Sequence, residues 1–451
     1  MEFADFILAH DGDDLGALAL SRGKYLSDVE DFNLALTTLE VRRKLRGKVP
    51  AWYAVPGLRF PLRLSGEQCS SEETAFYKAL VVAGAAGYTK KADSVLTNVP
   101  EGRWLRKKPG LCVTGCPLKV ADLTGGLGVD SWAFSKVATE GLYNEMQPEL
   151  AAAAQHNFRE LGVNNIVVRS CELSRSNLHQ ILGDFSPDLI YLDPARRDSA
   201  GRKVFRLEDC SPNVLELLPD LLNAAPQLLL KLGPMADITL VCKQLSSVRE
   251  VHVVAADGEC KELLLLLERG YEGEHDTAVY ENGSILLVDQ VQGDYGRGGI
   301  LGGGPGPKGI IAPGPESVWT RSKDGEENAD MGGGSFLFEP GKALLKAGAF
   351  DLPCRFGLRK IGRHTHYYLG DVPEALKPFG KVYTIIEVVP LNNRSIKEIA
   401  RRYPLASVTA RNIPLTSDEL RKKLGVKEGG TVHIFGLSSD SEKYLVVASG
   451  A

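Results

Sequence analysis

A glycine-rich loop with a carboxylate ahead of it is the part of this sequence best suited to chemistry. The stretch DLTGGLGVDS (122–131) closes an apolar run with Asp122 and then places Gly125, Gly126 and Gly128 within four residues. Glycines after a strand let a ligand approach the backbone, and the helix that follows presents unpaired N–H groups. This combination predicts a nucleotide-binding loop.

The spacing within the loop bears on which nucleotide it binds. The dinucleotide fingerprint is G-x-G-x-x-G, and Gly126 and Gly128 fit it, but Ser131 stands in the third position. No arrangement for hydride transfer is visible in the sequence. S-adenosylmethionine carries a cationic sulfonium and an amino group, and both suit the carboxylate of Asp122. The loop therefore favours S-adenosylmethionine, with a nicotinamide cofactor as the alternative.

Further acidic residues follow the next two expected strands. Glu145 in GLYNEMQP lies about twenty residues after the loop, where a bidentate acceptor can hold ribose hydroxyls, although nicotinamide enzymes share that feature. The third expected strand ends at Ser170, Cys171 and Glu172, near the expected position of the adenine. The residues that we expect to bind the cofactor are Asp122, Thr124, Gly125, Gly126, Gly128, Asp130, Glu145, Met146 and Glu172.

The fourth expected strand carries the most informative motif. DLIYLDPARR (188–197) ends with Asp193-Pro194, at the point where a parallel sheet opens into its crevice. Asp-Pro at this place resembles motif IV of class I methyltransferases that act on nucleobases or amino groups. Asp193 can accept a hydrogen bond from an exocyclic amine, and Arg196 can stack on a base or hold a phosphate. The expected catalytic residues are Asp193, Pro194, Arg196 and Arg197.

The same motif leaves a second methylation chemistry open. D-P-A-R also resembles the D-P-P-R of RNA uracil-C5 methyltransferases, in which a cysteine nucleophile activates the ring. Cys210, in LEDCSP, is the only cysteine shortly after the motif. We favour methylation of nitrogen and keep methylation of carbon, through Cys210, as the alternative.

The elements that position these residues are expected between 110 and 270. Short apolar runs such as LKVADL and DLIYLDP alternate there with helical stretches, which predicts a parallel, doubly wound sheet. Asp257-Gly258 is a hairpin signal between two further strand-like runs, so the sheet is expected to finish with an antiparallel strand. Residues 1–109 show helical spacing and predict a helical N-terminal region.

The remainder of the chain is expected to hold a linker and two small domains. Residues 271–334 are interpreted as a linker with a flexible insertion, 292–334, that is rich in glycine and proline. Residues 335–379 predict a compact unit, and 380–451 predict a small α+β domain. From 355 to 430 there are fifteen Lys and Arg against seven Asp and Glu, within a chain whose net charge is −4.

Most of the chain resembles one subfamily of class I methyltransferases, with a helical N-terminal region, a ferredoxin-like unit and a THUMP-like C-terminal domain. The resemblance implies an α/β fold with a seven-stranded, doubly wound, Rossmann-like sheet, and S-adenosylmethionine as the cofactor. It also implies that 335–379 is the ferredoxin-like unit and 380–451 the THUMP-like domain. The matching stretches are LSGEQCSSEETAFYKA (64–79), VADLTGGLGVDSWAFS (120–135), YLDPARR (191–197), GECKELLLL (258–266), FLFEPGKALLKAGAF (336–350) and RNIPLTSDELRKKLGVKEGGTVHIF (411–435).

THUMP-type domains are associated with RNA-modifying enzymes, so the resemblance implies that the substrate is RNA, either tRNA or rRNA. The basic excess agrees, because Lys and Arg side chains neutralise phosphates, although a merely solvated basic face would look the same. VRRKLRGK (41–48) can add to this surface. The basic residues expected to contact RNA are Arg394, Lys397, Arg401, Arg402, Arg411, Arg421, Lys422 and Lys423.

Composition excludes several other classes of protein. The 451 residues have globular apolar (43%) and charged (24%) fractions, and no apolar run reaches the ~18–20 residues of a membrane span. Because the start of the chain is acidic, unlike a secretory signal, we expect a cytoplasmic protein. We expect no metal, since neither Cys112 and Cys116 nor the histidines of HTH (364–366) form a complete site.

The alternative function is a non-catalytic methyltransferase fold that binds RNA or protein.

Overall fold

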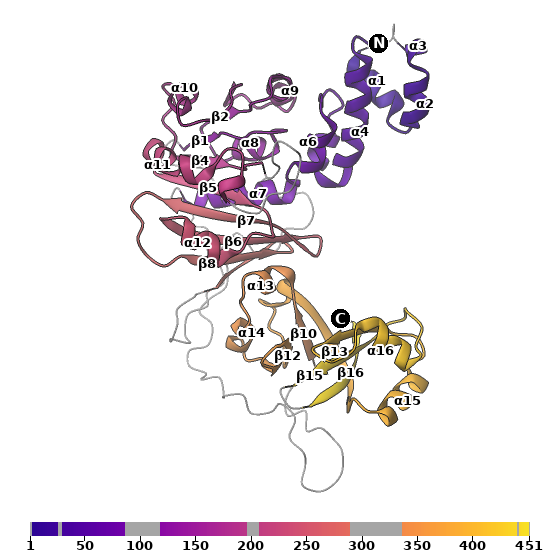
Figure 1. Cartoon of the computed structure of the whole chain (residues 1–451). Coiled ribbons are helices and arrows are strands. Elements are labelled where there is room, and N and C mark those ends of the chain that lie inside the picture. Colours follow the sequence, from indigo (N-terminus) through magenta and orange to yellow (C-terminus); the bar gives the residue numbers. More distant parts are fainter. Residues whose placement is uncertain are drawn as a thin grey trace. The chain divides into compact units, whose positions relative to one another are not determined.

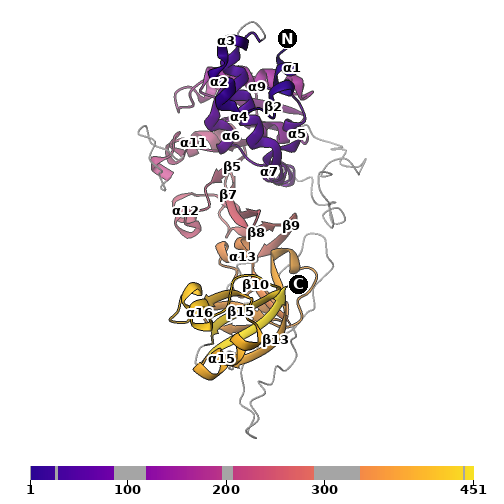
Figure 2. The ribbon, with the colours of Figure 1, turned by 90° about the vertical axis from the view of Figure 1, so that its right-hand side faces the viewer.

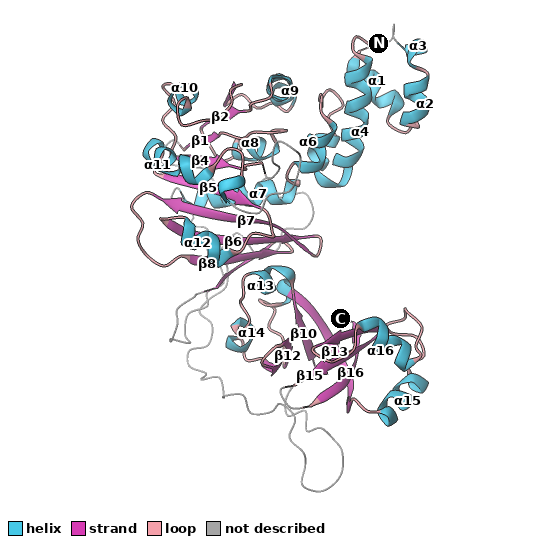
Figure 3. Ribbon diagram, viewed as in Figure 1, coloured by secondary structure: helices cyan, strands magenta, loops and turns pink. Residues whose placement is uncertain are grey.

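The computed structural model describes residues 2–25, 29–85, 118–195, 207–288, 336–439 and 442–450 (Figure 1). Both helices and strands occur in these ranges (Figure 3). The chain divides into two compact units. The first comprises Met1–His252 and Lys261–His275, and the second comprises Val253–Cys260 and Asp276–Ala451.

The first unit begins with helices, which confirms the expected helical N-terminal region. Side-chain oxygens cap two of them, since Asp14 accepts from the N–H of Ala17 and Asp31 accepts from the N–H of Leu34. The helix α4 lies against α5 and α6 (Figures 1 and 2). The helices of this region are α1 (Phe3–His10), α2 (Leu15–Leu20), α3 (Arg22–Tyr25), α4 (Phe32–Lys48), α5 (Pro50–Tyr53), α6 (Arg63–Gln68) and α7 (Glu72–Ala85).

These helices pack on the α/β part of the same unit. Asn157 on α9 (Pro148–Glu160) exchanges two hydrogen bonds with the backbone of Arg59, at 2.8 and 2.9 Å. Trp132 on α8 (Val129–Phe134) meets Trp52 edge to face, with ring centroids 6.1 Å apart. Because both tryptophans are buried, the helical region and the α/β part share a core.

The sheet of the first unit confirms the expected parallel arrangement and its antiparallel finish. Its first seven strands lie in the order β3-β2-β1-β4-β5-β7-β6, within a sheet of nine strands. Neighbouring strands from β3 to β5 are parallel, and β5 pairs antiparallel with β7. The strands are β1 (Lys119–Asp122), β2 (Glu140–Asn144), β3 (Ile166–Arg169), β4 (Leu189–Leu192), β5 (Gln227–Leu232), β6 (Val248–Ala256) and β7 (Glu259–Glu268).

The strand order reverses between β1 and β4, and a sheet of this kind opens a crevice there at the carboxyl ends of its strands. Asp122, the last residue of β1, pairs with Tyr143 on β2 and Tyr191 on β4. The residues that follow these three strands therefore meet at one edge of the sheet. The remaining helices of the unit are α10 (Leu178–Leu182), α11 (Val214–Ala224), α12 (Ile238–Gln244) and the short 3-10 turn η2 (Leu207–Asp209).

The second unit contains a hairpin where the sequence predicted a linker. β8 (Asp276–Glu281) and β9 (Ser284–Val288) pair antiparallel across Asn282-Gly283, and both turn residues have positive φ. Asn-Gly is the preferred pair for a two-residue hairpin turn because both residues tolerate this conformation. The segment 271–334 therefore begins with paired strands, and its glycine- and proline-rich part, 292–334, lies outside the described residues.

A second sheet confirms the expected small α+β domains. Its order is β11-β12-β10-β13-β16-β15-β14; β14 and β15 are parallel and the other neighbours are antiparallel. Its strands are β10 (Phe336–Pro340), β11 (Arg359–Gly362), β12 (Thr365–Leu369), β13 (Gly380–Pro390), β14 (Ser407–Arg411), β15 (Val432–Ser438) and β16 (Lys443–Gly450). Its helices are α13 (Lys342–Lys346), α14 (Leu352–Arg355), η3 (Lys377–Phe379), α15 (Asn393–Arg402) and α16 (Ser417–Leu424).

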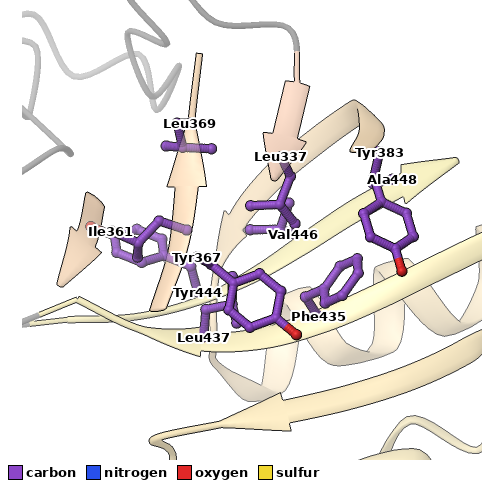
Figure 4. Close-up of a cluster of buried hydrophobic side chains, with 10 residues drawn as sticks. All are labelled: Leu337, Ile361, Tyr367, Leu369, Tyr383, Phe435, Leu437, Tyr444, Val446 and Ala448. Atoms are coloured by element: carbon purple, nitrogen blue, oxygen red, sulfur yellow. The ribbon is translucent and has the colours of Figure 1, made fainter. Parts of the chain in front are cut away.

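Apolar clusters cover the two faces of this second sheet. One cluster joins side chains from β10, β11, β12, β13, β15 and β16, among them Leu337, Tyr367 and Phe435 (Figure 4). The other includes Ile434 and Leu420, the latter from α16. Phe435 and Ile434 are consecutive on β15 and point to opposite faces. Successive apolar residues of a strand therefore contribute to both faces, so each face of the sheet can be covered by other apolar side chains.

Candidate functional site

The glycine-rich stretch forms the loop between β1 and α8. Gly126 and Gly128 both have positive φ, +53° and +94°, which side-chain-bearing residues rarely adopt. Gly125 has a different reason to be glycine, because a Cβ there would collide with the ring of Tyr143. The hydroxyl of Tyr143 also donates to the carbonyl oxygen of Gly126, at 2.5 Å. These contacts with Tyr143 hold the loop against the end of β2.

Asp122, the last residue of β1, fixes the start of this loop through hydrogen bonds. Its carboxylate is buried and accepts two hydrogen bonds, from the Ser131 hydroxyl at 2.5 Å and from the backbone N–H of Thr124 at 3.1 Å. Ser131, the residue that departs from the dinucleotide fingerprint, is therefore the partner of this carboxylate. Burial raises the pKa of Asp122 to about 8.

Glu145 connects the end of β2 to the same loop. One of its carboxylate oxygens accepts the N–H of Gly126 at 2.9 Å, and the other accepts the N–H of Gln147 at 2.9 Å. A carboxylate has about four acceptor positions, so ribose hydroxyls can still bind to it. Met146 beside it is 56% exposed, and Glu172, after β3, is also exposed.

Asp193 follows β4 and is tied to the glycine loop through its backbone. The N–H of Asp193 donates to the Thr124 hydroxyl at 2.7 Å, and the next residue, Pro194, is buried. The Asp193 side chain remains 33% exposed. The structure therefore brings the motif of the fourth strand and the glycine loop together, with one carboxylate accessible between them.

The Asp193 carboxylate forms an ion pair with Lys231 on β5, at 2.6 Å. In the parallel register Leu192 lies beside Leu230, so the next residues, Asp193 and Lys231, are neighbours across the strand ends. Burial alone would lower the pKa of Lys231, but the carboxylates of Asp193, Glu262 and Asp130 outweigh burial and raise it. Lys231 is therefore a cation at neutral pH.

A second lysine completes a network of buried charges around this pair. Lys78 on α7 is fully buried and lies 2.7 Å from Glu262 on β7 and 3.2 Å from Asp130 on α8. Ser70 accepts from Lys78 at 3.0 Å and donates to Asp130 at 2.9 Å. Burial opposes the charged form of Asp130, but Lys78 and Lys231 outweigh it and lower the pKa of this carboxyl. Asp130 is therefore part of a structural network that includes the helical N-terminal region.

Sequence reasoning missed Lys78, Lys231, Glu262 and Ser70. Each lysine sits inside an apolar run, AFYKALVV and LLLKLG, and Glu262 precedes LLLLL. A charge within such a run is a signal in itself, since buried charges are almost always paired. The partners could not be identified from this signal, because Lys78 and Glu262 are 184 residues apart.

Some expected site residues lie outside the described ranges, and another is buried. Arg196 and Arg197 lie outside the described residues, as do Cys112 and Cys116. Cys210 is buried, and it precedes Ser211, whose backbone pairs with that of Ala195. Among the described residues, no three His, Cys, Asp or Glu side chains gather to hold a metal ion. No helix in the described ranges has both the length and the apolar character to cross a membrane.

Most of the expected RNA-binding residues are exposed, Arg394 and Arg402 included, and three of them form ion pairs. Arg394, Arg402 and Arg421 form ion pairs with Glu398, Glu387, and both Asp418 and Glu428, respectively. Further exposed basic residues of the same region are Lys397, Arg401, Arg411, Lys422 and Lys423.

The basic segment 41–48 is mostly engaged within the first unit. Arg42 and Arg43 donate to backbone carbonyls of the N-terminal region, and Lys44 pairs with Glu40 and Glu67. Lys48 donates to the carbonyl of Glu67. These contacts give the segment a structural role.

Comparisons with known proteins bear on the fold of this chain and on its domains. Family models match residues 336–375 as a ferredoxin-like domain and residues 380–449 as THUMP domain-like. The crystal structure of a "putative methyltransferase" from Porphyromonas gingivalis W83 is similar, with a TM-score of 0.70 and 26% identity. That similarity covers 100% of this chain and 97% of the other. No curated protein matches the sequence.

Two further structures are similar over part of the chain. An rRNA methylase from Streptococcus thermophilus has 13% identity over 34% of this chain and 87% of its own, with a TM-score of 0.25. M. capricolum TrmK in complex with S-adenosyl-homocysteine has 10% identity over 37% of this chain and 68% of its own, with a TM-score of 0.27. The chain thus combines a class I methyltransferase fold with a ferredoxin-like and a THUMP-like domain.

The raised pKa of Asp122 predicts how stability depends on pH. The folded state holds the proton up to about pH 8, whereas the unfolded chain releases it near pH 4. The contribution of Asp122 to stability is therefore fully present below about pH 4 and falls as the pH rises to about 8, by at most ~1.4 kcal/mol per pH unit. Asp122→Asn keeps an acceptor oxygen without the charge, so this variant should be more stable than the parent at pH 8.5 and lose that advantage towards pH 5.

Thermal unfolding from pH 5 to pH 9 measures this difference. Asp188→Asn is the control, because it makes the same change at an exposed position that also accepts a backbone N–H, from Lys119. A stability difference between Asp122→Asn and the parent that stays constant over this pH range would contradict the assignment.

Proposed function

We propose that this protein is an S-adenosylmethionine-dependent methyltransferase that modifies a base in RNA, on a nitrogen atom. The observation that carries the proposal is the position of Asp193. Its carboxylate is accessible and paired with Lys231, and its backbone N–H donates to Thr124 of the glycine loop, at the switch point of the sheet. The similarity to the Porphyromonas gingivalis structure, along the whole chain, supports the same class of activity.

The chain offers a set of groups that fit the cofactor. The loop of Gly125, Gly126 and Gly128 lets a ligand approach the backbone, Glu145 has acceptor positions left for the ribose, and Met146 presents an exposed apolar surface beside it. We further assign Thr124, Asp130 and the exposed Glu172 to this site, Thr124 and Asp130 by shaping the loop and α8. Asp122 acts through Ser131 and Thr124, whose positions it fixes.

The chemistry of Asp193 follows from its charge and exposure. When bound, S-adenosylmethionine supplies a methyl group on a cationic sulfonium. An amine nitrogen that accepts this group must be oriented towards it and must give up one proton. Asp193 can accept the hydrogen bond of that N–H, and the 2.6 Å contact with Lys231 orients its carboxylate. Pro194 makes the turn rigid, and we assign Arg196 and Arg197 to the base or a phosphate of the substrate.

Two observations make nitrogen a better target than carbon. Methylation of a pyrimidine carbon needs a cysteine nucleophile in contact with the ring, and Cys210 is buried. The Asp193 carboxylate is partly exposed and can accept a hydrogen bond, which suits an amine. The C5 reaction through Cys210 and a binding protein without turnover are the outcomes that the experiments below would reveal.

We assign RNA recognition to the THUMP-like domain. Its match to a family model and its exposed basic residues, including Lys422 and Lys423 at the end of α16, support an RNA partner such as tRNA or rRNA. RNA modification also fits a protein that works in the cytoplasm. The methyltransferase fold would then act on a base that this domain delivers.

Cofactor binding and methyl transfer should separate between two variants. Glu145→Ala should weaken S-adenosylmethionine binding by roughly 1–3 kcal/mol, because it removes hydrogen bonds to a charged acceptor and loosens Gly126. Asp193→Ala should leave binding within a few-fold and reduce transfer to RNA at least ~10²-fold. Calorimetry and single-turnover transfer to RNA from cells lacking the gene provide the two measurements.

Several results would oppose this assignment. Binding of NAD, or S-adenosylmethionine affinity that does not change in Glu145→Ala, would remove the cofactor proposal. Transfer at the parent rate by Asp193→Ala would place the reaction elsewhere. A Cys210→Ala variant without activity, together with a covalent adduct between the parent and a 5-fluoropyrimidine RNA, would establish carbon methylation instead.

RNA affinity should depend on the exposed basic residues of the THUMP-like domain. Lys422→Gln/Lys423→Gln removes two phosphate-binding charges, so the slope of log affinity against log salt should fall by about 1.4–1.8. Arg22→Gln/Lys24→Gln is the matched control, since it removes two exposed charges from a short helix of the first unit. Equal effects of the two double variants in filter binding at several salt concentrations would show that the α16 charges are only solvated.

A further inference from the structure

Lys78 brings an amino group of the helical N-terminal region into the buried cluster that also holds Lys231 of the proposed transfer site. Its side chain is 0% exposed, although it lies on α7, far in sequence from the strand-end motifs. Its ammonium contacts Glu262, Asp130 and Ser70, at 2.7, 3.2 and 3.0 Å. None of these groups is on the surface, so Lys78 has a function inside the fold.

Glu262 lies between the two lysines and can pair with either. One oxygen is 2.7 Å from Lys78, and the other is 3.8 Å from Lys231. Lys231 itself is 2.6 Å from Asp193. The short contact of Glu262 is therefore made to Lys78, and the short contact of Lys231 is made to Asp193. Without Lys78, Glu262 would be a buried carboxylate whose nearest cation is Lys231.

From this geometry we infer that Lys78 is a positioning residue for the transfer reaction, which holds Glu262 and so leaves Lys231 paired with Asp193. The inference rests on the proposed function, in which Asp193 orients the reacting nitrogen. It gives the helical N-terminal region a part in the reaction, because α7 supplies the charge that decides where Lys231 points. Lys78 itself does not touch the substrate.

The other groups around Lys231 and Lys78 do not replace this role. Ser70 lies 3.5 Å from Lys231, and it and Tyr191 both donate to Asp130 at 2.9 Å. Asp130 therefore keeps two hydrogen-bond donors when Lys78 is replaced. The nearby carboxylate of Asp122 is held by Ser131 and Thr124. Glu262 is the member of the cluster that would lose its closest partner.

A purely structural role for Lys78 is the competing explanation, and a double variant separates the two. Lys78→Met should draw Lys231 towards Glu262 and away from Asp193. Lys78→Met/Glu262→Gln removes one positive and one negative charge, so the cluster keeps the net charge of the parent, and Glu262 no longer competes with Asp193 for Lys231. A positioning role predicts that the second substitution recovers most of the lost transfer. A structural role predicts a double variant that is at least as impaired as the single one, because both ends of the contact are gone.

Single-turnover transfer to RNA from cells lacking the gene gives the decisive readout. Lys78→Met should transfer about 10–100-fold more slowly at pH 7, a smaller loss than the ~10²–10⁴-fold contribution of a positioned proton-transfer group itself. S-adenosylmethionine affinity should stay within a few-fold. Lys24→Met, which removes a lysine from the exposed surface of α3, should match the parent throughout.

The outcomes against the inference are equally specific. A folded double variant that transfers as slowly as Lys78→Met overturns it. A double variant that does not fold also overturns it, since the contact would then be needed by the fold itself.

Crystal structures of the two variants distinguish this inference from the proposed function. They should show Lys231 next to Glu262 in Lys78→Met and next to Asp193 in the double variant. Failure of the parent to methylate any RNA would reject the proposed function, whereas an unmoved Lys231 in Lys78→Met would reject the inference.

Discussion

A lysine side chain that is largely buried needs an ion-pair partner. Lys231 is paired with Asp193, whose carboxylate follows the fourth strand and remains accessible. Removing one member of a buried ion pair leaves an uncompensated charge and destabilises a protein strongly. The cluster meets this constraint with two lysines and three carboxylates, from α7, α8, β5, β7 and the end of β4. The position of Asp193 is therefore determined by the whole first unit as well as by its own turn.

The glycine loop depends on the same edge of the sheet. Thr124 accepts the N–H of Asp193, and Glu145 accepts the N–H of Gly126, so the ends of β1, β2 and β4 are joined by hydrogen bonds to one loop. A cofactor that contacts this loop and a substrate that contacts Asp193 would then be held in a fixed relation. This relation matters because displacement of a methyl group requires the donor and the acceptor to be aligned.

Local spacing was enough to predict part of this site, and long-range pairing was not. The glycines, Asp122, Glu145 and Asp193 stand in short motifs at strand ends, so the parallel sheet and the edge where they meet followed from sequence. The roles of Lys78, Lys231 and Glu262 depend on contacts between distant segments. The hairpin at Asn282-Gly283 was missed although its turn signal is local, because the glycine- and proline-rich stretch after it dominated the interpretation of 271–334. The roles assigned to Arg196 and Arg197 stay predictions.

The central claim is that this protein methylates RNA through Asp193. Nucleoside mass spectrometry tests it most directly, on RNA from cells with the gene, without it, and without it but carrying either the parent gene or Asp193→Asn. The account predicts that one methylated nucleoside disappears with the gene, returns with the parent gene and stays absent with Asp193→Asn. An unchanged set of methylated nucleosides in the cells without the gene, or full recovery of the missing one by Asp193→Asn, would contradict it.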